Sequence, residues 1–352
     1  MNEENGRFEI DCNAVGALFV EVKTTHTLAD LGVGFRKIAI STCDYSAGLS
    51  SIPLLMVQIT RFKCGSVCMG FTTHHHIVDA LASAYFVVSW ARVARGLELD
   101  VLPFHDRAAY VAPRVPTQIK FRHLEYEPPF PSLPPKTLTG EMPTTREFMF
   151  NFNKRYINNI KLQATSKPQK AQTYNLSTYE VLAGHVWRTT CKARGLIGDQ
   201  DVKLYIHIDG RLKLKGPTLP RGYFGNVIFF TACIAKARDI TCNPVWYAAS
   251  MVHEALMKVQ NTEYLRSAID HLESQSDLDS IVRGAPHVTC PNLMINSWAK
   301  LPTDLADFGW GKPNLMAHGG IINEGQAFFI TNPKEEGAIS LNIKLFDDHI
   351  SL

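Results

Sequence analysis

Alternating and continuous apolar runs in the N-terminal third predict strands followed by a helix. Segments 54–62 and 66–73 read as a strand pair joined by the turn KCG, and 15–22 reads as another strand. Residues 7–12, RFEIDC, also alternate and predict a strand. Apolar residues then recur with helical spacing from Leu81 onward, and the glycine that ends the run suits a helix C-terminus.

The C-terminal part shows a similar mixture of patterns. The sequence predicts strands at 147–153, 203–210, 292–298, 327–333 and 339–346, and helices at 154–165 and 177–194 and across 244–284. Ser177 and Glu180 form an S-x-x-E capping box at the start of the second helix. Because strands and helices do not alternate strictly, we expect a mixed fold, α/β or α+β.

A proline-rich stretch divides these two parts. Residues 127–146 contain six prolines and should run extended rather than form a helix or central strand. A chain of 352 residues is also long for one hydrophobic core. We therefore predict an N-terminal domain at 1–126, a linker at 127–146 and a C-terminal domain at 147–352, with the active site between the domains.

Composition and charge narrow the class of protein. The chain is 45% hydrophobic and 20% charged, with a net charge of +3, which is typical of a globular protein and gives no reason to expect a nucleic-acid surface. The eight cysteines lack the spacing of a disulfide framework, and no signal peptide or membrane span is apparent. We expect a cytoplasmic monomer.

The segment HHHIVDA, 74–80, offers the clearest candidate chemistry. It lies between a predicted strand and a predicted helix, where Asp79 is placed to cap the helix N-terminus. An imidazole titrates near neutral pH, so His75, four residues before the aspartate, could act as a general base. A turn of satisfied polar side chains is the alternative interpretation.

A metal site is a third interpretation of the same segment. Cys64 and Cys68 precede the three histidines, and both would face one side of an extended segment. Adjacent histidines on a strand point in alternating directions, whereas zinc needs convergent ligands. The spacing is not a standard zinc pattern, so we predict no metal.

A second motif, DFGWGKP at 307–313, gives HHHIVDA a companion. Together they resemble the plant BAHD acyltransferase family, whose members move acyl groups from coenzyme A to alcohols or amines. The resemblance covers nearly the whole chain and is closest to the branch that acts on shikimate or quinate. Its further pieces are STYEVLAGHVWR (177–188), KLYIHIDGR (203–211), GYFGNVIFF (222–230), EYLRSAIDHLE (263–273), IVRGA (281–285) and CPNLMINSW (290–298).

The resemblance implies a two-domain fold like that of chloramphenicol acetyltransferase, with the thioester of hydroxycinnamoyl-CoA as co-substrate and no bound cofactor. His75 matches the general base that deprotonates the acceptor hydroxyl. Trp298 matches a residue lining the site, with an indole N–H suited to the oxyanion. Arg283 matches the arginine that binds the acceptor carboxylate, and Asn296 faces the acceptor. Without the resemblance, Trp298 could be a core residue and Arg283 a surface ion pair.

Supporting roles follow from the same resemblance. Asp79 is expected to turn away from the cleft and pair with an arginine, for which Arg211 is the candidate. Asp307 lies in a motif near the site and is sometimes described as a second base, although its glycine neighbours indicate a tight turn. The candidates for acyl-CoA binding are Ser177, Thr178, Arg211, Lys213, Ser297 and Lys300.

The chain departs from the family pattern at several positions. Ala80 stands where glycine is usual and could strain the backbone. Asn296 replaces a usual threonine, and DGRLKLK (209–215) has lysine where a second arginine is usual. By the same resemblance, we expect that the given sequence lacks the family's N-terminal segment and part of its C-terminal helix. Transfer to another alcohol or a polyamine, or a truncated inactive pseudoenzyme, therefore remain alternatives, while DFGWG argues against a bacterial condensation domain.

Overall fold

The structure, a computed structural model, describes residues 9–31, 48, 51–131, 143–165, 175–276, 285–332 and 335–349. The chain divides into two compact units. Unit 1 comprises Met1–His105, Phe224–Asn226 and Pro302–Gly320, and unit 2 comprises Asp106–Tyr223, Val227–Leu301 and Ile321–Leu352. The described residues therefore fall into two bodies, but neither is a continuous stretch of chain.

These units differ from the predicted domains in two places. Residues 106–126 belong to unit 2, although the sequence analysis placed them in the N-terminal domain. The DFGWG segment belongs to unit 1, although it was placed in the C-terminal domain. The described part of the predicted linker ends in a strand that begins at Thr145, while 132–142 lie outside the described residues.

Unit 1 is built on a small sheet of order β1-β2-β3 among its described residues. Strand β1 (Leu18–Lys23) runs parallel to β2 (Leu55–Arg61), which is antiparallel to β3 (Val67–Thr73). The predicted turn between the last two strands is confirmed, with Gly65 at a φ of +82° that favours glycine. The strand predicted at 7–12 is wrong for its described residues, 9–12, which are exposed and have no strand conformation.

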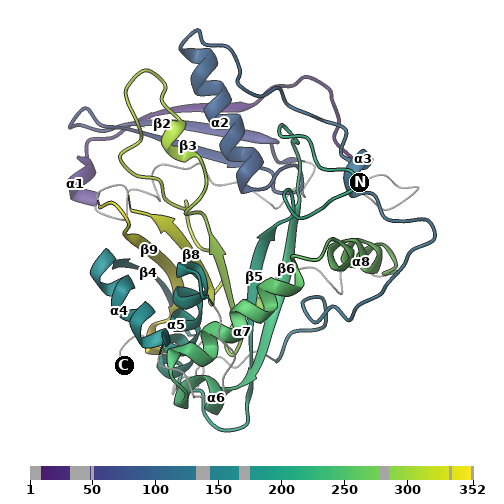
Figure 1. Cartoon of the computed structure of the whole chain (residues 1–352). Helices are drawn as coiled ribbons and strands as arrows, with labels where there is room; N and C mark the ends of the chain where they lie inside the picture. Colours follow the sequence, from purple (N-terminus) through teal and green to yellow (C-terminus); the bar gives the residue numbers. More distant parts are fainter. Residues whose placement is uncertain are drawn as a thin grey trace. The chain divides into compact units, whose positions relative to one another are not determined.

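Helix α2 (Ala80–Ala94) follows β3 (Figure 1), and its Phe86 ring packs against Phe71 of that strand. Asp79 caps it by accepting a hydrogen bond from the Ala82 amide, as predicted. Gly96 has a φ of +70° just beyond the last turn, also as predicted. The described residues of unit 1 also form two short elements, α1 (Leu28–Leu31) and the 3₁₀ turn η4 (Thr303–Leu305).

Unit 2 contains a sheet of six described strands in the order β4-β9-β8-β7-β5-β6. Strands β5, β7 and β8 are parallel to one another, and the remaining pairings are antiparallel. The strands are β4 (Thr145–Phe152), β5 (Asp201–Asp209), β6 (Ile228–Lys236), β7 (Leu293–Ser297), β8 (Gln326–Thr331) and β9 (Ile339–Phe346). The sequence analysis did not assign β6 as a strand.

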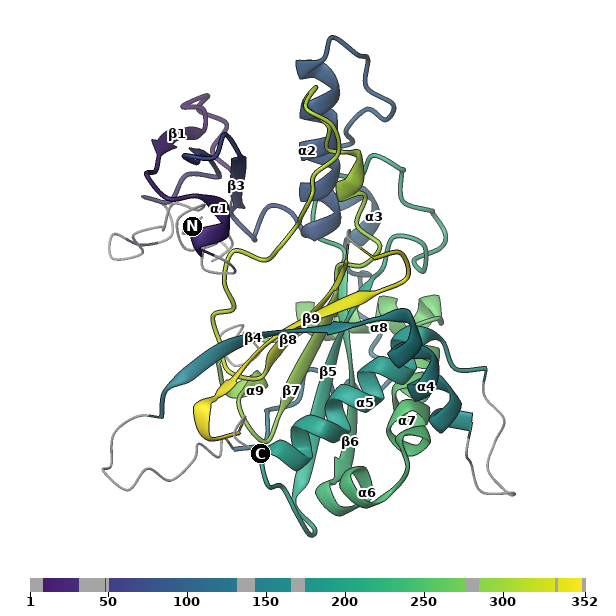
Figure 2. The same ribbon diagram turned by 90° about the vertical axis from the view of Figure 1, so that its left-hand side faces the viewer.

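Helices cover this sheet, with α4, α5, α6 and α7 gathered on one side of it (Figure 2). The helices of unit 2 are α3 (Ala108–Val111), α4 (Lys154–Thr165), α5 (Thr178–Ala193), α6 (Ala237–Cys242), α7 (Val245–Lys258), α8 (Thr262–Glu273) and α9 (Ala285–Val288), followed by the 3₁₀ turn η5 (Asp347–His349). The capping box predicted at Ser177 and Glu180 is confirmed. Helix α6 was not predicted as a separate element.

Helices α5 and α7 approach each other at a glycine. A Cβ atom at Gly184 would lie 2.5 Å from the backbone nitrogen of Ala249, so no larger residue fits without a shift. The carboxylate of Glu180 accepts a hydrogen bond at its own helix N-terminus and also lies 2.8 Å from Nδ1 of His253 on α7. The start of α5 is therefore held both by its own cap and by the neighbouring helix.

The segment 114–126 is bound to α8 by buried polar side chains. The carboxylate of Asp270, on α8, accepts hydrogen bonds from the backbone N–H and the Nε of Arg114 and from the backbone N–H of Gln118. Ser267 Oγ accepts from the amide of Lys120 and lies 3.0 Å from Nε2 of His123. These bonds explain why this part of the chain belongs to unit 2.

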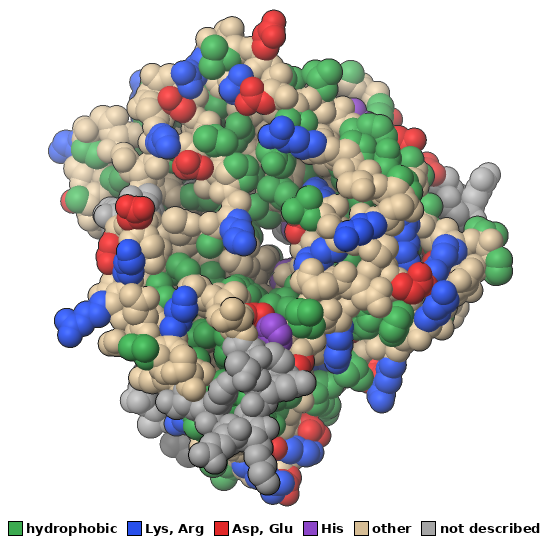
Figure 3. Space-filling model, in the orientation of Figure 1, with side chains coloured by type: hydrophobic (Ala, Val, Ile, Leu, Met, Phe, Trp, Pro, Cys, Tyr) green, Lys and Arg blue, Asp and Glu red, His purple; other side chains and the backbone are tan. Residues whose placement is uncertain are grey.

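Acidic and basic side chains lie interspersed on the face shown in Figure 3, in keeping with the net charge of +3. The cysteines among the described residues are free thiols. None of the described helices combines the length and the apolar character needed to cross a membrane.

Replacing Asp270 by asparagine should destabilise the protein by about 2–4 kcal/mol, because an N–H donor would be left without its buried acceptor. Burial alone would raise the pKa of Asp270, but the hydrogen bonds from Arg114 and Gln118 outweigh it and hold this pKa below its usual range. The carboxylate therefore stabilises the fold above the unfolded pKa of about 4, and this contribution is lost as pH falls through the folded value.

Urea unfolding of wild type and Asp270→Asn at pH 7 and pH 3 measures both effects. The difference in unfolding free energy should shrink at the lower pH. The matched control is Asp199→Asn, because that carboxylate is exposed in an ion pair with Arg238 and should cost less than about 1 kcal/mol. Equal effects of the two substitutions would contradict the role given to Asp270.

Candidate functional site

The backbone of HHHIVDA forms a tight turn between β3 and α2. The N–H of His74 donates to the carbonyl of Leu54 at 3.0 Å and so extends the strand pairing by one residue. The N–H of Ile77 donates to the carbonyl of His74 at 2.9 Å, which closes the turn. The buried carboxylate of Asp79 then caps α2. The strand, the turn and the helix cap together fix the path of the chain at His75.

The three histidine side chains have different surroundings. The rings of His74 and His76 lie next to each other, with centroids 4.9 Å apart. His75 and His76 are both exposed, whereas His74 is partly buried. No hydrogen bond or ion pair joins the His75 imidazole to a described residue, so its nitrogens are available to a ligand. Burial, together with repulsion from His76 and His75, lowers the pKa of His74.

Asn226 holds the His75 backbone from a distant part of the sequence. Its Nδ2 donates to the carbonyl oxygen of His75 at 2.9 Å. The same short segment is fixed to unit 1 by the Phe224 amide, which donates to the Phe104 carbonyl at 2.9 Å, and by the Phe224 ring against Phe86. The sequence analysis quoted GYFGNVIFF but gave Asn226 no role, because only the structure reveals this contact.

Asp307 organises the turn of the DFGWG segment. Its Oδ1 accepts the backbone N–H groups of Gly309 at 2.7 Å and Gly311 at 2.9 Å, and both glycines have positive φ. Its Oδ2 lies 3.3 Å from Nη1 of Arg95. The hydrogen bond from Gly309 is the largest cause that lowers the pKa of Asp307, with Gly311 and Arg95 acting in the same direction. The carboxylate is thus held in its ionised form.

The position of this turn separates Asp307 from His75. Arg95 caps the C-terminal end of α2, and Phe308 packs edge-on against Trp90 in the same half of the helix. His75 precedes the other end of α2, which is about 22 Å long. Asp307 and His75 therefore lie toward opposite ends of α2. Figure 2 shows the yellow-green segment that includes DFGWG beside this helix.

In unit 2, three candidate residues follow one another at the end of β7. Asn296 and Ser297 close the strand, and Trp298 continues its pairing by donating its backbone N–H to the Phe329 carbonyl at 2.8 Å. Since side chains alternate along an extended chain, Asn296 and Trp298 share one side and Ser297 takes the other. The partly buried indole of Trp298 packs edge-on against Phe328, with centroids 5.3 Å apart.

The first turn of α5 lies close to this strand end. The hydroxyl of Tyr179 donates to the Ile295 carbonyl at 3.5 Å, and its ring packs on Phe329. Ser177 is exposed as the N-cap, and Thr178 begins the helix, with its hydroxyl 3.5 Å from Nζ of Lys161. Unit 2 therefore brings Ser177 and Thr178 near the β7 residues, although nothing in the sequence pattern required it.

Arg211 and Lys213 lie in the turn that follows β5. This strand is parallel to β7, so its carboxyl end meets the sheet edge where β7 ends. Arg211 pairs with Asp209 at 3.0 Å, and Nζ of Lys213 donates to Gln260 at 2.8 Å. Burial lowers the pKa of Lys213, partly offset by Asp209. The predicted pairing of Arg211 with Asp79 stays a prediction, and Lys300 is exposed just beyond β7.

Three other expectations have different outcomes. Arg283 lies outside the described residues. The strain suspected at Ala80 is absent, because Ala14 is the one non-glycine residue with positive φ in the described ranges, and Ala80 begins α2 with ordinary backbone. In the described part of the chain, no group of three or more His, Cys, Asp and Glu side chains could hold a metal ion.

Comparison with known proteins identifies the family. The model of the Transferase family matches residues 1–352. The chain is 47% identical over 359 residues to a shikimate O-hydroxycinnamoyltransferase from Nicotiana tabacum, an alignment that covers 99% of the chain and 81% of that protein.

The chain belongs to the Transferase family of BAHD acyltransferases.

It is thus an acyl-CoA-dependent acyltransferase. Its similar proteins do not share one acceptor. Anthranilate N-benzoyltransferase protein 3 from Dianthus caryophyllus is 45% identical over 353 residues, which cover 98% of the chain and 78% of that protein.

Solved structures bear out the predicted mixed α/β, two-domain fold. The crystal structure of F. sporotrichioides TRI101 complexed with coenzyme A and T-2 aligns with a TM-score of 0.75 at 16% identity, covering 95% of this chain and 78% of that one. The crystal structure of vinorine synthase aligns with a TM-score of 0.70 at 20% identity, covering 97% of this chain and 76% of that one. At these identities the likeness concerns the fold alone.

Replacing Asp307 by asparagine should leave most of the acyltransferase activity, because the Oδ1 acceptor for Gly309 and Gly311 is kept. The lost attraction to Arg95 is that of a surface pair, worth less than about 1 kcal/mol. Asp307→Ala removes the acceptor as well and should lower the melting temperature and the activity together. Steady-state kinetics and thermal melts check this, and a loss in Asp307→Asn as large as in a His75 variant would contradict it.

Proposed function

We propose that this acyltransferase moves a hydroxycinnamoyl group, such as p-coumaroyl, from coenzyme A to a hydroxyl of shikimate or quinate. The observation that carries the proposal is His75, an exposed imidazole on a turn fixed by the β3 pairing, the Asp79 cap and Asn226. A proton acceptor must be both accessible and held in place, and His75 meets both conditions. The 47% identity to a shikimate O-hydroxycinnamoyltransferase supports the choice of acceptor.

His75 acts in this proposal as the general base. It takes the proton of the acceptor hydroxyl while the oxygen attacks the thioester carbonyl, which gives a tetrahedral oxyanion. Collapse of this intermediate expels the coenzyme A thiolate, and the imidazolium of His75 returns the proton to it. No covalent acyl-enzyme forms.

Residues of unit 2 take the binding roles. Trp298 supplies the indole N–H as oxyanion donor, a function commonly worth about 3 kcal/mol. Asn296, on the same side of the chain, contacts the acceptor. Arg283 binds the acceptor carboxylate through its guanidinium fork. Acyl-CoA contacts fall to Ser177, Thr178, Arg211, Lys213, Ser297 and Lys300, with Asp79 as structural support.

The geometry supports a structural role for Asp307. Its carboxylate organises a glycine turn at the far end of α2 and is held ionised by backbone N–H groups and Arg95. We assign it no proton transfer. Its contribution is to brace the helix whose first residue follows the histidine turn.

A second acceptor, the amine of anthranilate, is favoured by a specific observation. Several similar proteins are named anthranilate N-benzoyltransferases, at 45% identity. Anthranilate also carries a carboxylate for Arg283, and Asn296 replaces the threonine usual in the shikimate branch. A polyamine is disfavoured, because the charge of Arg283 would repel a cationic acceptor.

His75→Ala should lower kcat by about 10²-fold or more, the usual contribution of a general base. His74→Ala should leave most of the activity, since that ring packs against His76. Coenzyme A release under saturating substrates measures both, with thermal melts confirming that the variants fold. Equal losses in the two variants would rule out His75 as the specific base.

Acceptor choice is tested by coenzyme A release from p-coumaroyl-CoA with shikimate, quinate, anthranilate or spermidine as separate acceptors. We expect turnover with shikimate or quinate and none with spermidine. Arg283→Ala should raise KM for the carboxylated acceptor and leave KM for the acyl-CoA nearly unchanged. Turnover with anthranilate alone would show that the acceptor is anthranilate and not shikimate or quinate. The absence of turnover with every acceptor, in a well-folded chain, would overturn the proposal.

A further inference from the structure

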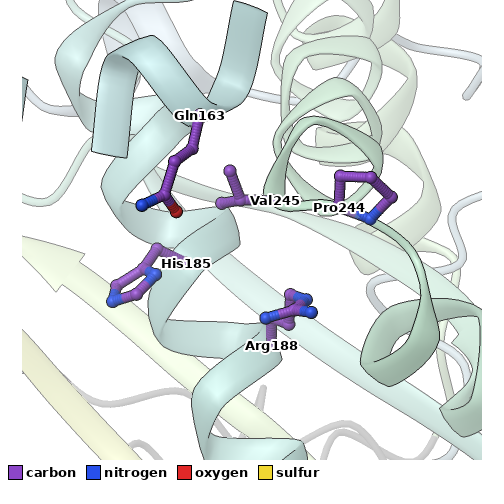
Figure 4. A pocket seen from close by; sticks show the side chains of 5 residues that line it. All are labelled: Gln163, His185, Arg188, Pro244 and Val245. Carbon is purple, nitrogen blue, oxygen red and sulfur yellow. The ribbon is translucent and has the colours of Figure 1, made fainter. Parts of the chain in front are cut away.

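A hollow in unit 2 lies away from the residues assigned to acyl transfer. It has a volume of about 280 Å³ and is lined by Gln163 from α4, His185 and Arg188 from α5, and Pro244 and Val245 at the start of α7. Figure 4 shows these side chains around one space, with the amide of Gln163 pointing toward His185. None of the five described residues that line it carries a carboxylate.

Arg188 is a partly buried cation without an acidic partner among the described residues. Its Nε donates to the carbonyl oxygen of Asn243 at 2.8 Å, which fixes the plane of the guanidinium. Its two terminal nitrogens make no hydrogen bond or ion pair within the described ranges. A guanidinium edge that is oriented in this way presents two parallel N–H donors, the geometry that binds phosphate or carboxylate oxygens.

His185 adds a second donor one helical turn before Arg188, on the same face of α5. Its Nε2 lies 3.2 Å from the hydroxyl of Tyr156, which leaves Nδ1 for the hollow. Burial, followed by the charge of Arg188, lowers the pKa of His185, and no carboxylate opposes these effects. The amide of Gln163 is a third donor, because no described residue engages it.

We propose that this hollow binds a phosphate group, held by the guanidinium of Arg188 and by donors from His185 and Gln163. Donors that come from two helices can reach different oxygens of a tetrahedral anion, whereas a planar carboxylate would occupy the guanidinium edge alone. The phosphate belongs either to the free ion or to a phosphorylated nucleotide such as the 3′-phosphate of coenzyme A. The proposal stands independently of the acyl acceptor and of the role of His75.

A bound dianion would change the titration of His185 in a defined direction. A negative charge within about 4–6 Å favours the imidazolium and raises a histidine pKa. The pKa of His185 should therefore rise when phosphate binds, the opposite of the effect that Arg188 exerts on it now. A purely structural role of Arg188 would leave this titration unchanged.

The test titrates inorganic phosphate into the full chain at constant ionic strength, with chloride as the reference anion. NMR follows the His185 ring through its pH titration, and calorimetry measures the affinity. We expect millimolar binding and an upward shift of the His185 pKa in phosphate only. If phosphate and chloride give the same His185 titration, the proposal is wrong.

Three variants separate the site from general charge effects. Arg188→Gln should weaken phosphate binding by about tenfold or more, since charged hydrogen bonds are lost. Arg188→Lys keeps the positive charge but loses the paired N–H donors of the guanidinium, so its affinity for phosphate should be intermediate. This variant also tests the proposal if Arg188→Gln fails to fold. The matched control, Arg221→Gln, removes an exposed arginine of the same unit. Equal affinities of Arg188→Gln and Arg221→Gln would overturn the proposal.

Competition distinguishes the two sources of the phosphate. Displacement of phosphate from the wild-type hollow by coenzyme A, but not by 3′-dephospho-coenzyme A, would identify the nucleotide 3′-phosphate as the ligand. Failure of both to displace it would identify the free ion. Coenzyme A and 3′-dephospho-coenzyme A could both displace phosphate, and equally well in wild type and in Arg188→Lys. That result would mean that the anion binds elsewhere, and it would contradict the assignment to this hollow.

Discussion

The geometry of the histidine turn depends on how α2 is held at its two ends. At the N-terminal end, the buried carboxylate of Asp79 accepts the Ala82 amide, where the helix dipole also favours a negative charge. At the C-terminal end, Arg95 pairs with Asp307, whose turn places Phe308 against Trp90. A helix fixed in this way gives the preceding residues a rigid support. The backbone that carries the exposed imidazole of His75 is thereby held in place.

Unit 2 achieves positioning by a different means, the parallel strands of its sheet. Strands β5 and β7 end at the same edge, so the turn with Arg211 and Lys213 and the run Asn296–Trp298 come together although they are far apart in the sequence. The capped start of α5 joins them through the contacts of Tyr179 with Ile295 and Phe329. Polar candidates therefore gather at strand and helix ends, while most of the side chains buried along the strands are apolar.

Local chemistry made part of this structure predictable. The paired strands around KCG, the Asp79 cap and the S-x-x-E box each depend on residues a few positions apart, and all three are found. The strand predicted at 7–12 failed for its described residues because alternation alone supplies no partner strand. The placement of DFGWG in unit 1, the attachment of 114–126 to α8 and the hydrogen bond from Asn226 depend on long-range contacts that no local pattern encodes.

The contact between Asn226 and His75 determines when, during synthesis of the chain, the histidine turn can reach its final geometry. The two residues are 151 positions apart, and Arg95 and Asp307 are 212 apart. At about 5–20 residues per second, a ribosome adds Asn226 roughly 8–30 s after His75. The N-terminal strands and α2 can form during this interval, but the turn lacks the donor that holds its carbonyl. The proposed base thus reaches its final geometry only after most of the chain has been synthesised.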